Sequence, residues 1–176
     1  MEISAPGGHL DHYIRQTRAH HVQLSYMADT KANMILTVSS LMIPLSLRYL
    51  TEPAFKWAAG VMILFCILTV VLAAVAAIPK VPLISPRSKM EPDLDDPSYN
   101  ILFFGNFFCL DYDKFVKNME EIMNDHSRTY ETQLREVYVT GQYLAKKKYR
   151  FVRLAYITFI AGMVTTLAVY FVQHAF

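Results

Sequence analysis

Two long runs of uncharged, mostly apolar residues constrain what this chain can fold into. One is the 22 residues from Trp57 to Ile78, and the other is the 19 residues from Leu154 to Val172. At about 1.5 Å of rise per residue, a helix of either length reaches across the roughly 30 Å hydrocarbon core of a bilayer. A soluble domain of this size has no interior that needs two such segments. The sequence therefore predicts an integral membrane protein.

A third apolar run, Ala32–Leu47, is shorter and more polar. As a helix its 16 uncharged residues reach only about 24 Å, so we expect Lys31 and Arg48 to extend towards the two interfaces. Its interrupting residues are Asn33, Thr37, Ser39, Ser40, Pro44 and Ser46. Polar groups are unfavourable against lipid, so we expect them to face other helices or water, and Pro44 to kink the helix. The helix either makes close helix–helix contacts through these residues, or lines a conduit or moves on activation.

The basic residues are distributed unevenly around these runs. Of the 17 Lys and Arg residues, three precede the first run, and Arg48 and Lys56 lie in the gap that follows it. The remaining twelve lie between Lys80 and Arg153, and none follows Arg153. Because basic residues favour the cytoplasmic side, we expect the N-terminus and the 80–153 segment in the cytoplasm. The short gap and the C-terminus are then expected outside.

Helical periodicity extends beyond the spans at the N-terminal end. Residues 9–31 carry a broad apolar face and predict a cytoplasmic helix. We expect it to continue directly into a first membrane helix at 32–50, because no Pro or Gly interrupts the chain between Gly8 and Pro44. After the second membrane helix (57–78), a proline-rich and acidic segment at 79–98 predicts an extended linker.

Residues 99–151 contain no proline and are predicted to form a cytoplasmic helical segment. The apolar run Ile101–Leu110 is too short to span a membrane, so we expect it to pack into this bundle or to lie in the membrane interface. Asp111 or Asp113 is expected to cap a short helix. Ser127 is expected to cap the next helix.

A heptad-like spacing that begins near Arg128 continues into the third membrane helix at 152–173 without a break. A single helix of about 45 residues would be nearly 70 Å long. Its polar half carries a narrow seam of the kind that pairs with the 9–31 helix or with a second copy. The sequence thus predicts an all-α protein with three transmembrane helices and a cytoplasmic helical bundle.

Sequence motifs for catalysis are missing. The chain has no Gly-rich phosphate loop, no G-x-S-x-G and no H-E-x-x-H. His9, His12 and His20 lie on one predicted helix, but no Cys or carboxylate cluster completes a tetrahedral metal site. Cys66 and Cys109 are expected to be small packing residues. We therefore expect a protein that is not an enzyme and holds neither a metal nor a cofactor.

The segment A-D-T-K-A-N at residues 28–33 places charge where the first helix meets the membrane. A carboxylate at this depth needs a partner, so Asp29 should pair with Lys31, with a basic residue of the 146–153 cluster, or with a backbone donor. One hypothesis is that this segment sets a resting state. The alternative is a simple boundary with a snorkelling lysine. The residues that we expect to act in gating or structure are Asp29, Lys31, Asn33 and Pro44.

The 28–33 motif and three later segments together resemble the Pycsar effector transmembrane family of bacterial antiphage defence. The later segments are F-F-G-N-F at 103–107, D-Y-D-K-F at 111–115 and K-K-K-Y-R at 146–150, and the resemblance runs from about residue 15 to residue 172. It implies an effector of the bacterial inner membrane that a cyclic pyrimidine mononucleotide activates. That nucleotide would come from a partner cyclase on phage infection. The effector would then oligomerise or rearrange and impair membrane integrity.

If a nucleotide binds, it must use the helical cytoplasmic part, where basic groups can meet a phosphate and aromatic faces can stack on the base. The residues that we expect to bind it are Arg15, Arg18, Lys146, Lys147 and Lys148. The expected partners are the lipid bilayer, further copies of the chain and the cyclase, which acts through its soluble product. No nucleic-acid polymer is expected.

Two other functions remain possible. The first is a small-solute or ion transporter or channel, which would need a charged or coordinating residue in mid-membrane; the second and third spans have none. The other is a passive membrane adaptor that recruits a soluble partner to the long helix. Vesicle permeability distinguishes the adaptor from a membrane-damaging effector.

Overall fold

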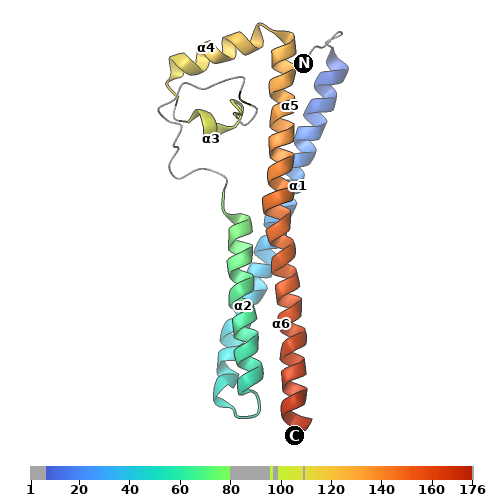
Figure 1. The fold of residues 1–176 in the computed structure, drawn as a ribbon, viewed down its shortest axis with the longest axis vertical. Coiled ribbons are helices and arrows are strands. Elements are labelled where there is room, and N and C mark those ends of the chain that lie inside the picture. Colours follow the sequence, from blue (N-terminus) through green and yellow to red (C-terminus); the bar gives the residue numbers. More distant parts are fainter. Residues whose placement is uncertain (1–6, 80–95, 97–98, 109, 176) are drawn as a thin grey trace. The chain divides into compact units, whose positions relative to one another are not determined.

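The computed structural model describes residues 7–79, 96, 99–108 and 110–175. Helices hold 88% of these residues and none of them lies in a strand, which confirms the predicted all-α fold. The elements (Figure 1) are α1 (Gly8–Arg48), the 3-10 turn η1 (Tyr49–Thr51), α2 (Lys56–Ala77), α3 (Phe104–Phe107), α4 (Tyr112–Met123), α5 (His126–Tyr143), the π-helix η2 (Leu144–Tyr149) and α6 (Arg150–Ala175). Most of the predicted linker at 79–98 lies outside the described residues.

The chain divides into two compact units. The polar unit comprises the described residues up to Gln23 and those between Pro79 and Tyr143. The span unit comprises Leu24–Ile78 and the described residues from Leu144 onward. Helix α1 contributes residues to both units, and the helix that begins with α5 passes into the span unit at η2.

Three helices in the described part of the chain are long and apolar enough to cross a membrane. They are Gly8–Thr51, Lys56–Ala77 and His126–Ala175. Each contains one of the three predicted spans. As expected from the lack of an interrupting Pro or Gly, α1 continues from its polar half into the first span, and Pro44 lies inside it.

The third long helix comprises 50 residues from His126 to Ala175, against the 45 or so that were predicted. Its middle is a π-helix, Leu144–Tyr149, which contains the three consecutive lysines. In a π-helix the backbone bonds reach one residue further than in an α-helix, which shifts the register of everything downstream. Hydrophobic periodicity did not reveal this segment, because three of its six residues are consecutive lysines.

Small side chains hold the span unit together. One buried cluster joins Ala28 and Ala32 of α1 to Ala76 of α2 and Val152 of α6, and a second follows one turn further along the helices. Between helices in lipid, close contact of backbones replaces the hydrophobic driving force, so small residues are favoured. Gly162 is the extreme case, because a Cβ built there would lie 2.5 Å from Cβ of Phe65.

The polar residues of the first span divide between two faces of α1. Ser39 and Ser46 are buried, with 0% and 7% of their surface exposed. Asn33, Thr37 and Ser40 are exposed. The first group thus faces other helices, as expected, and the second group lies on a face of α1 that is exposed rather than packed against the rest of the chain.

The apolar run at 101–110 packs within the polar unit, which is one of its two expected placements. Ile101 and Tyr99 form a buried cluster with Ile122 of α4, and Phe115 and Met119 pack against it. Residues 104–107 of the run form the short helix α3. Burial against α4 thus gives Ile101 a protein environment, whereas Phe104 and Phe108 of the same run are exposed.

One helix cap differs from the prediction. Oδ1 of Asp125 accepts hydrogen bonds from the backbone N–H groups of Ser127 at 2.8 Å and Arg128 at 3.3 Å. Ser127 was predicted to be the cap, but it lies inside α5, and a carboxylate is the stronger acceptor at a helix N-terminus. Asp111 does occupy the N-cap position of α4, although its side chain makes no capping hydrogen bond.

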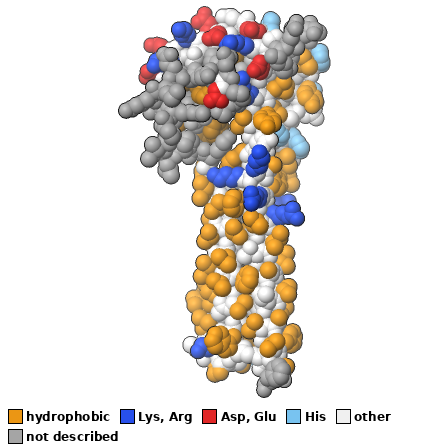
Figure 2. Space-filling model, in the orientation of Figure 1, with side chains coloured by type: hydrophobic (Ala, Val, Ile, Leu, Met, Phe, Trp, Pro, Cys, Tyr) orange, Lys and Arg blue, Asp and Glu red, His pale blue; other side chains and the backbone are white. Residues whose placement is uncertain are grey.

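The outward side chains of α2 and α6 are apolar, as a lipid-facing surface requires. Figure 2 shows hydrophobic side chains over the visible face of these helices. At one end of the span unit Phe55 stacks on Tyr170 with 5.2 Å between ring centroids, and Trp57 is exposed nearby in the chain. Aromatic residues gather in this way at membrane–water interfaces.

Candidate functional site

A buried ion pair joins α1 to the π-helix in the span unit. Nζ of Lys148 donates to both carboxylate oxygens of Asp29, each at 2.7 Å, and to Oγ of Ser25 at 2.8 Å. Lys148 is only 8% exposed. The three donors of its ammonium thus face three acceptors, so the charge is buried with its hydrogen bonds satisfied.

Two tyrosine hydroxyls add to the same contact between α1 and the helix formed by η2 and α6. Tyr149 donates to the backbone oxygen of Leu24 at 3.1 Å, and Tyr156 donates to the backbone oxygen of Lys31 at 3.2 Å. In these two contacts the residue numbers rise together along both helices, so α1 runs parallel to η2 and α6 here. The contacts fix the register of this parallel pair.

The π-helix places its lysines in different surroundings. Leu144 and Lys148 are buried, whereas Lys146 and Lys147 between them are exposed. Segments of π-helix are frequent at functional sites because the extra residue redirects side chains. Here the π-helix brings Lys148, rather than Lys146 or Lys147, to Asp29.

The predicted gating residues therefore differ in their surroundings. Asp29 pairs with the 146–153 cluster, which was one of its expected partners. Lys31, another expected partner, is exposed, and the structure brings its backbone oxygen rather than its ammonium into the contact with α6. Asn33 and Pro44 are exposed on the surface of α1.

In the polar unit, α1 pairs with α5, which confirms the predicted partner of the long helix. The hydroxyl of Tyr130 donates to Oδ1 of Asp11 at 2.9 Å, and this bond raises the pKa of Tyr130. A Cβ built on Gly141 would lie 3.3 Å from the His21 ring, so the two helices come close at this point. A larger residue at 141 would push against His21.

Arg18 makes the other contact between α1 and α5. Its Nη2 donates to Oε1 of Glu136 at 3.2 Å and lies 2.9 Å from Oε2. Burial raises the pKa of Glu136, although the nearby Arg18 lowers it in part. The charge on Glu136 is thus partly desolvated and depends on Arg18 for compensation.

The predicted phosphate-binding residues are divided between the two units. Arg15 and Arg18 belong to the polar unit, and Lys146, Lys147 and Lys148 belong to the span unit. Arg15, Lys146 and Lys147 are exposed, Arg18 is paired with Glu136, and Lys148 is paired with Asp29. A role in ligand binding stays a prediction for all five.

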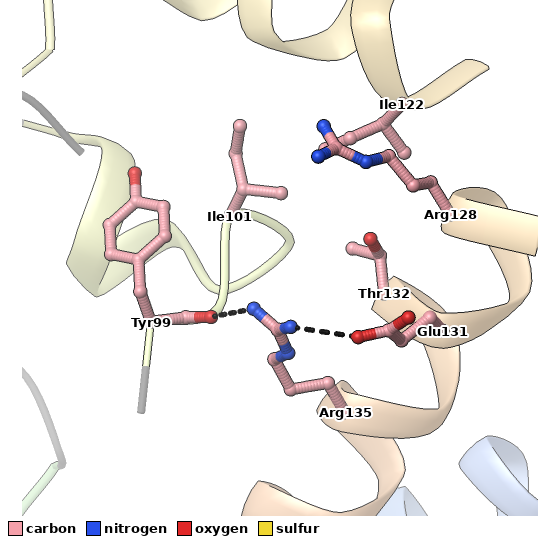
Figure 3. Close-up of a pocket in the computed structure, with 7 residues that line it drawn as sticks. All are labelled: Tyr99, Ile101, Ile122, Arg128, Glu131, Thr132 and Arg135. Carbon is pink, nitrogen blue, oxygen red and sulfur yellow. Dashed lines mark hydrogen bonds and ion pairs between the residues drawn. The ribbon is translucent and has the colours of Figure 1, made fainter. Parts of the chain in front are cut away.

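A second charged site, which the sequence did not reveal, lies between α5 and the 96–101 segment (Figure 3). Nη1 of Arg135 donates to the backbone oxygens of Asp96 at 3.0 Å and Tyr99 at 3.4 Å, and Nη2 bonds Glu131 at 3.2 Å. Arg128, which also lines the cavity, pairs with Glu121. The seven-residue spacing of the two arginines on one helix was the signal that could have found this site.

The cavity at this site has a volume of about 40 Å³. Small-molecule pockets are typically about 300–1,000 Å³, so it is too small for a mononucleotide in this conformation. Its arginine instead ties the apolar segment before α3 to the long helix. Among the described residues, no group of three His, Cys, Asp or Glu side chains could hold a metal ion.

These features define a small helical membrane protein whose membrane helices extend into a polar, helical part. The family model for the Pycsar effector protein domain matches residues 12–173, and the chain belongs to this family. It is a membrane effector of antiphage defence. No curated protein and no solved structure matches the chain.

Proposed function

We propose that this effector rests in the bacterial inner membrane until a cyclic pyrimidine mononucleotide, made by a partner cyclase on infection, activates it to impair membrane integrity. Membership of the family supports a role in defence at a membrane. The observation that carries the gating part is the Asp29–Lys148 pair, which joins α1 to the π-helix within the span unit. The protein acts by rearrangement and assembly, not as an enzyme.

The resting state in this proposal is the one in which Lys148 is bonded to Asp29 and Ser25. Both α1 and the long helix contribute residues to the polar unit as well as to the span unit. A ligand that binds one arrangement of α1 on α5 more tightly than another shifts the population towards that arrangement. The shift reaches the span unit through the helices and breaks or re-forms the pair.

The Arg18–Glu136 contact is the place in the polar unit where a ligand would replace a protein group. Arg18 is 46% exposed on its side chain, and burial already disfavours the charged form of Glu136. A cyclic phosphate could replace this carboxylate as the partner of Arg18, with Arg15 on the neighbouring exposed surface of α1. The freed Glu136 would take up a proton or turn towards solvent, which alters the contact of α1 with α5.

Dye release from vesicles tests the proposal. Purified protein in liposomes should release a trapped dye several-fold faster when cyclic UMP or cyclic CMP is added, and cyclic AMP is the control. A passive adaptor would give no release with any nucleotide. Release that is equally fast without nucleotide would contradict ligand gating, and no release with either pyrimidine nucleotide would contradict the proposed activity.

The orientation is a separate prediction, which rests on the basic residues. A reporter enzyme that is active only outside the cytoplasm should be active when fused after Phe176 and inactive when fused at Pro92. A reporter that fluoresces only in the cytoplasm, fused at the same two positions, should give the reverse pattern. The opposite result at either position would contradict the proposed orientation with a cytoplasmic N-terminus.

A further inference from the structure

The outward face of α1 carries a polar stripe along the first part of the first span. It consists of Asp29, Asn33, Thr37 and Ser40, which follow one another at intervals of four, four and three residues, and the apolar Pro44 follows four residues further on. Residues at this spacing lie on one face of a helix. Asn33, Thr37, Ser40 and Pro44 are exposed, and the Asp29 side chain is 41% exposed beside its bond to Lys148.

The other two membrane helices present no such stripe in the described structure. The exposed face of α2 includes Leu64, Ile67 and Val71, and that of α6 includes Ile160, Val164, Leu167 and Phe171. Lipid tails match those two faces. The exposed face of α1 is mixed, because the apolar Met34, Val38, Leu41 and Leu45 are exposed there as well. Beside them, the amide of Asn33 and the hydroxyl of Ser40 would lose their hydrogen bonds against hydrocarbon.

The stripe is only partly satisfied within its own helix. Oγ1 of Thr37 donates to the backbone oxygen of Asn33 at 2.9 Å, so this hydroxyl has a partner. The amide of Asn33 has two donors and an acceptor that point outward from α1. An open groove of about 530 Å³ runs along the same face and includes Asp29, Asn33 and Thr37 in its lining.

We propose that this stripe is the surface through which two copies of the chain associate in the membrane. An Asn side chain both donates and accepts, so two copies of Asn33 related by a two-fold axis satisfy each other. A soluble partner cannot reach this surface, because Ser40 lies about 13 Å along the helix from Lys31 at the membrane boundary. Lipid does not supply the missing hydrogen bonds, which leaves a second α1 as the matching occupant.

The position of the stripe links this association to the ion pair. Both carboxylate oxygens of Asp29 accept from Lys148, and its side chain, which remains 41% exposed, lies at the end of the stripe. A second α1 packed along the stripe would cover Asp29 and remove its remaining water. Covering strengthens the attraction between Asp29 and Lys148, since charges interact more strongly when water is excluded. Pairing of two chains would therefore stabilise the resting contact.

Disulfide trapping tests the proposed interface. In a chain with Cys66→Ala and Cys109→Ala, single cysteines are placed at Thr37 and Ser40 on the stripe, and at Ile67 and Ile160 on the two apolar faces as controls. The purified variants are reconstituted in vesicles of neutral phospholipid at a high ratio of lipid to protein and oxidised without nucleotide. The yield of disulfide-linked dimer should be roughly fivefold or more higher at the stripe positions than at the control positions.

Equal trapping at all four positions would indicate random collision and overturn the proposal. Preferential trapping at Ile67 or Ile160 would overturn it too, because α2 or α6 would then be the interface. Asn33→Leu should reduce trapping through Ser40→Cys several-fold, whereas Val164→Leu on the exposed face of α6 should leave it unchanged. Because nucleotide is absent, these outcomes are independent of whether nucleotide causes dye release.

Discussion

Replacing Asp29 with Ala should destabilise the span unit by about 2–4 kcal/mol, because it leaves the ammonium of Lys148 buried without its counter-charge. Lys148 is only 8% exposed, so water cannot easily replace the lost carboxylate. The estimate lies towards the lower part of the range for buried pairs because Asp29 is partly exposed. In a thermal unfolding experiment in detergent, the midpoint should fall by roughly 5–15 °C.

The matched control is Lys31→Ala, which removes an exposed charge two residues away. Its effect should stay within about 0.5 kcal/mol. Combining Asp29→Ala with Lys148→Met should recover most of the loss, because no unpaired charge then remains. A small effect of Asp29→Ala, or a double variant that is as unstable as the sum of the single variants, would contradict the role of the pair.

The same variants probe gating in cells. In a toxicity assay at matched expression, with and without the partner cyclase, Asp29→Ala and Lys148→Met should both depart from the wild type. Lys31→Ala should behave like the wild type, because Lys31 is exposed and only its backbone oxygen contacts α6. Normal toxicity of both pair variants would leave the ion pair as a structural feature only.

A two-residue insertion after Gly141 should abolish nucleotide-triggered dye release, at least about tenfold, and leave membrane insertion intact. Each added residue turns the helix by about 100°, so the insertion rotates everything after it by about 200° relative to α5. The contacts of α5 with Asp11 and Arg18 and the contact of Lys148 with Asp29 could then not form together on one α1 helix.

A matched insertion between Glu52 and Pro53 is the control, because these residues lie in the connection between η1 and α2 rather than within a long helix. It should leave dye release within about twofold of the wild type, as expected for a surface loop. If the Gly141 insertion also kept normal release, the two parts of the long helix would not be mechanically coupled. Membrane insertion is followed in both variants by carbonate extraction.

The helices and their approximate limits were predictable because hydropathy depends on composition alone. The two charge-free runs coincide with α2 and with much of α6, and the lack of Pro and Gly correctly predicted a continuous α1. A partner for Asp29 in the 146–153 cluster followed from the penalty for an unpaired charge at that depth. These inferences need no knowledge of how the helices pack.

The sequence did not predict which of the three consecutive lysines pairs with Asp29. It depends on the π-helix at Leu144–Tyr149, and a change from α to π register leaves no mark in a run of lysines. The exposure of Asn33, Thr37 and Ser40, in contrast to the burial of Ser39, depends on how α1 is rotated against its neighbours, and polarity alone does not predict that rotation. The cap at Asp125 was missed for a simpler reason, because two adjacent acceptors compete and the sequence does not rank them.

The alanines that line the span unit have a mechanical consequence. Ala28, Ala32, Ala73, Ala76 and Ala155 present short, similar side chains to one another. Contacts between alanines resist a shift of one helix along another only weakly, because a short side chain does not lock into a single position. The register of α1 against the π-helix and α6 therefore depends on the bonds of Lys148 to Asp29 and Ser25 and on the hydroxyls of Tyr149 and Tyr156.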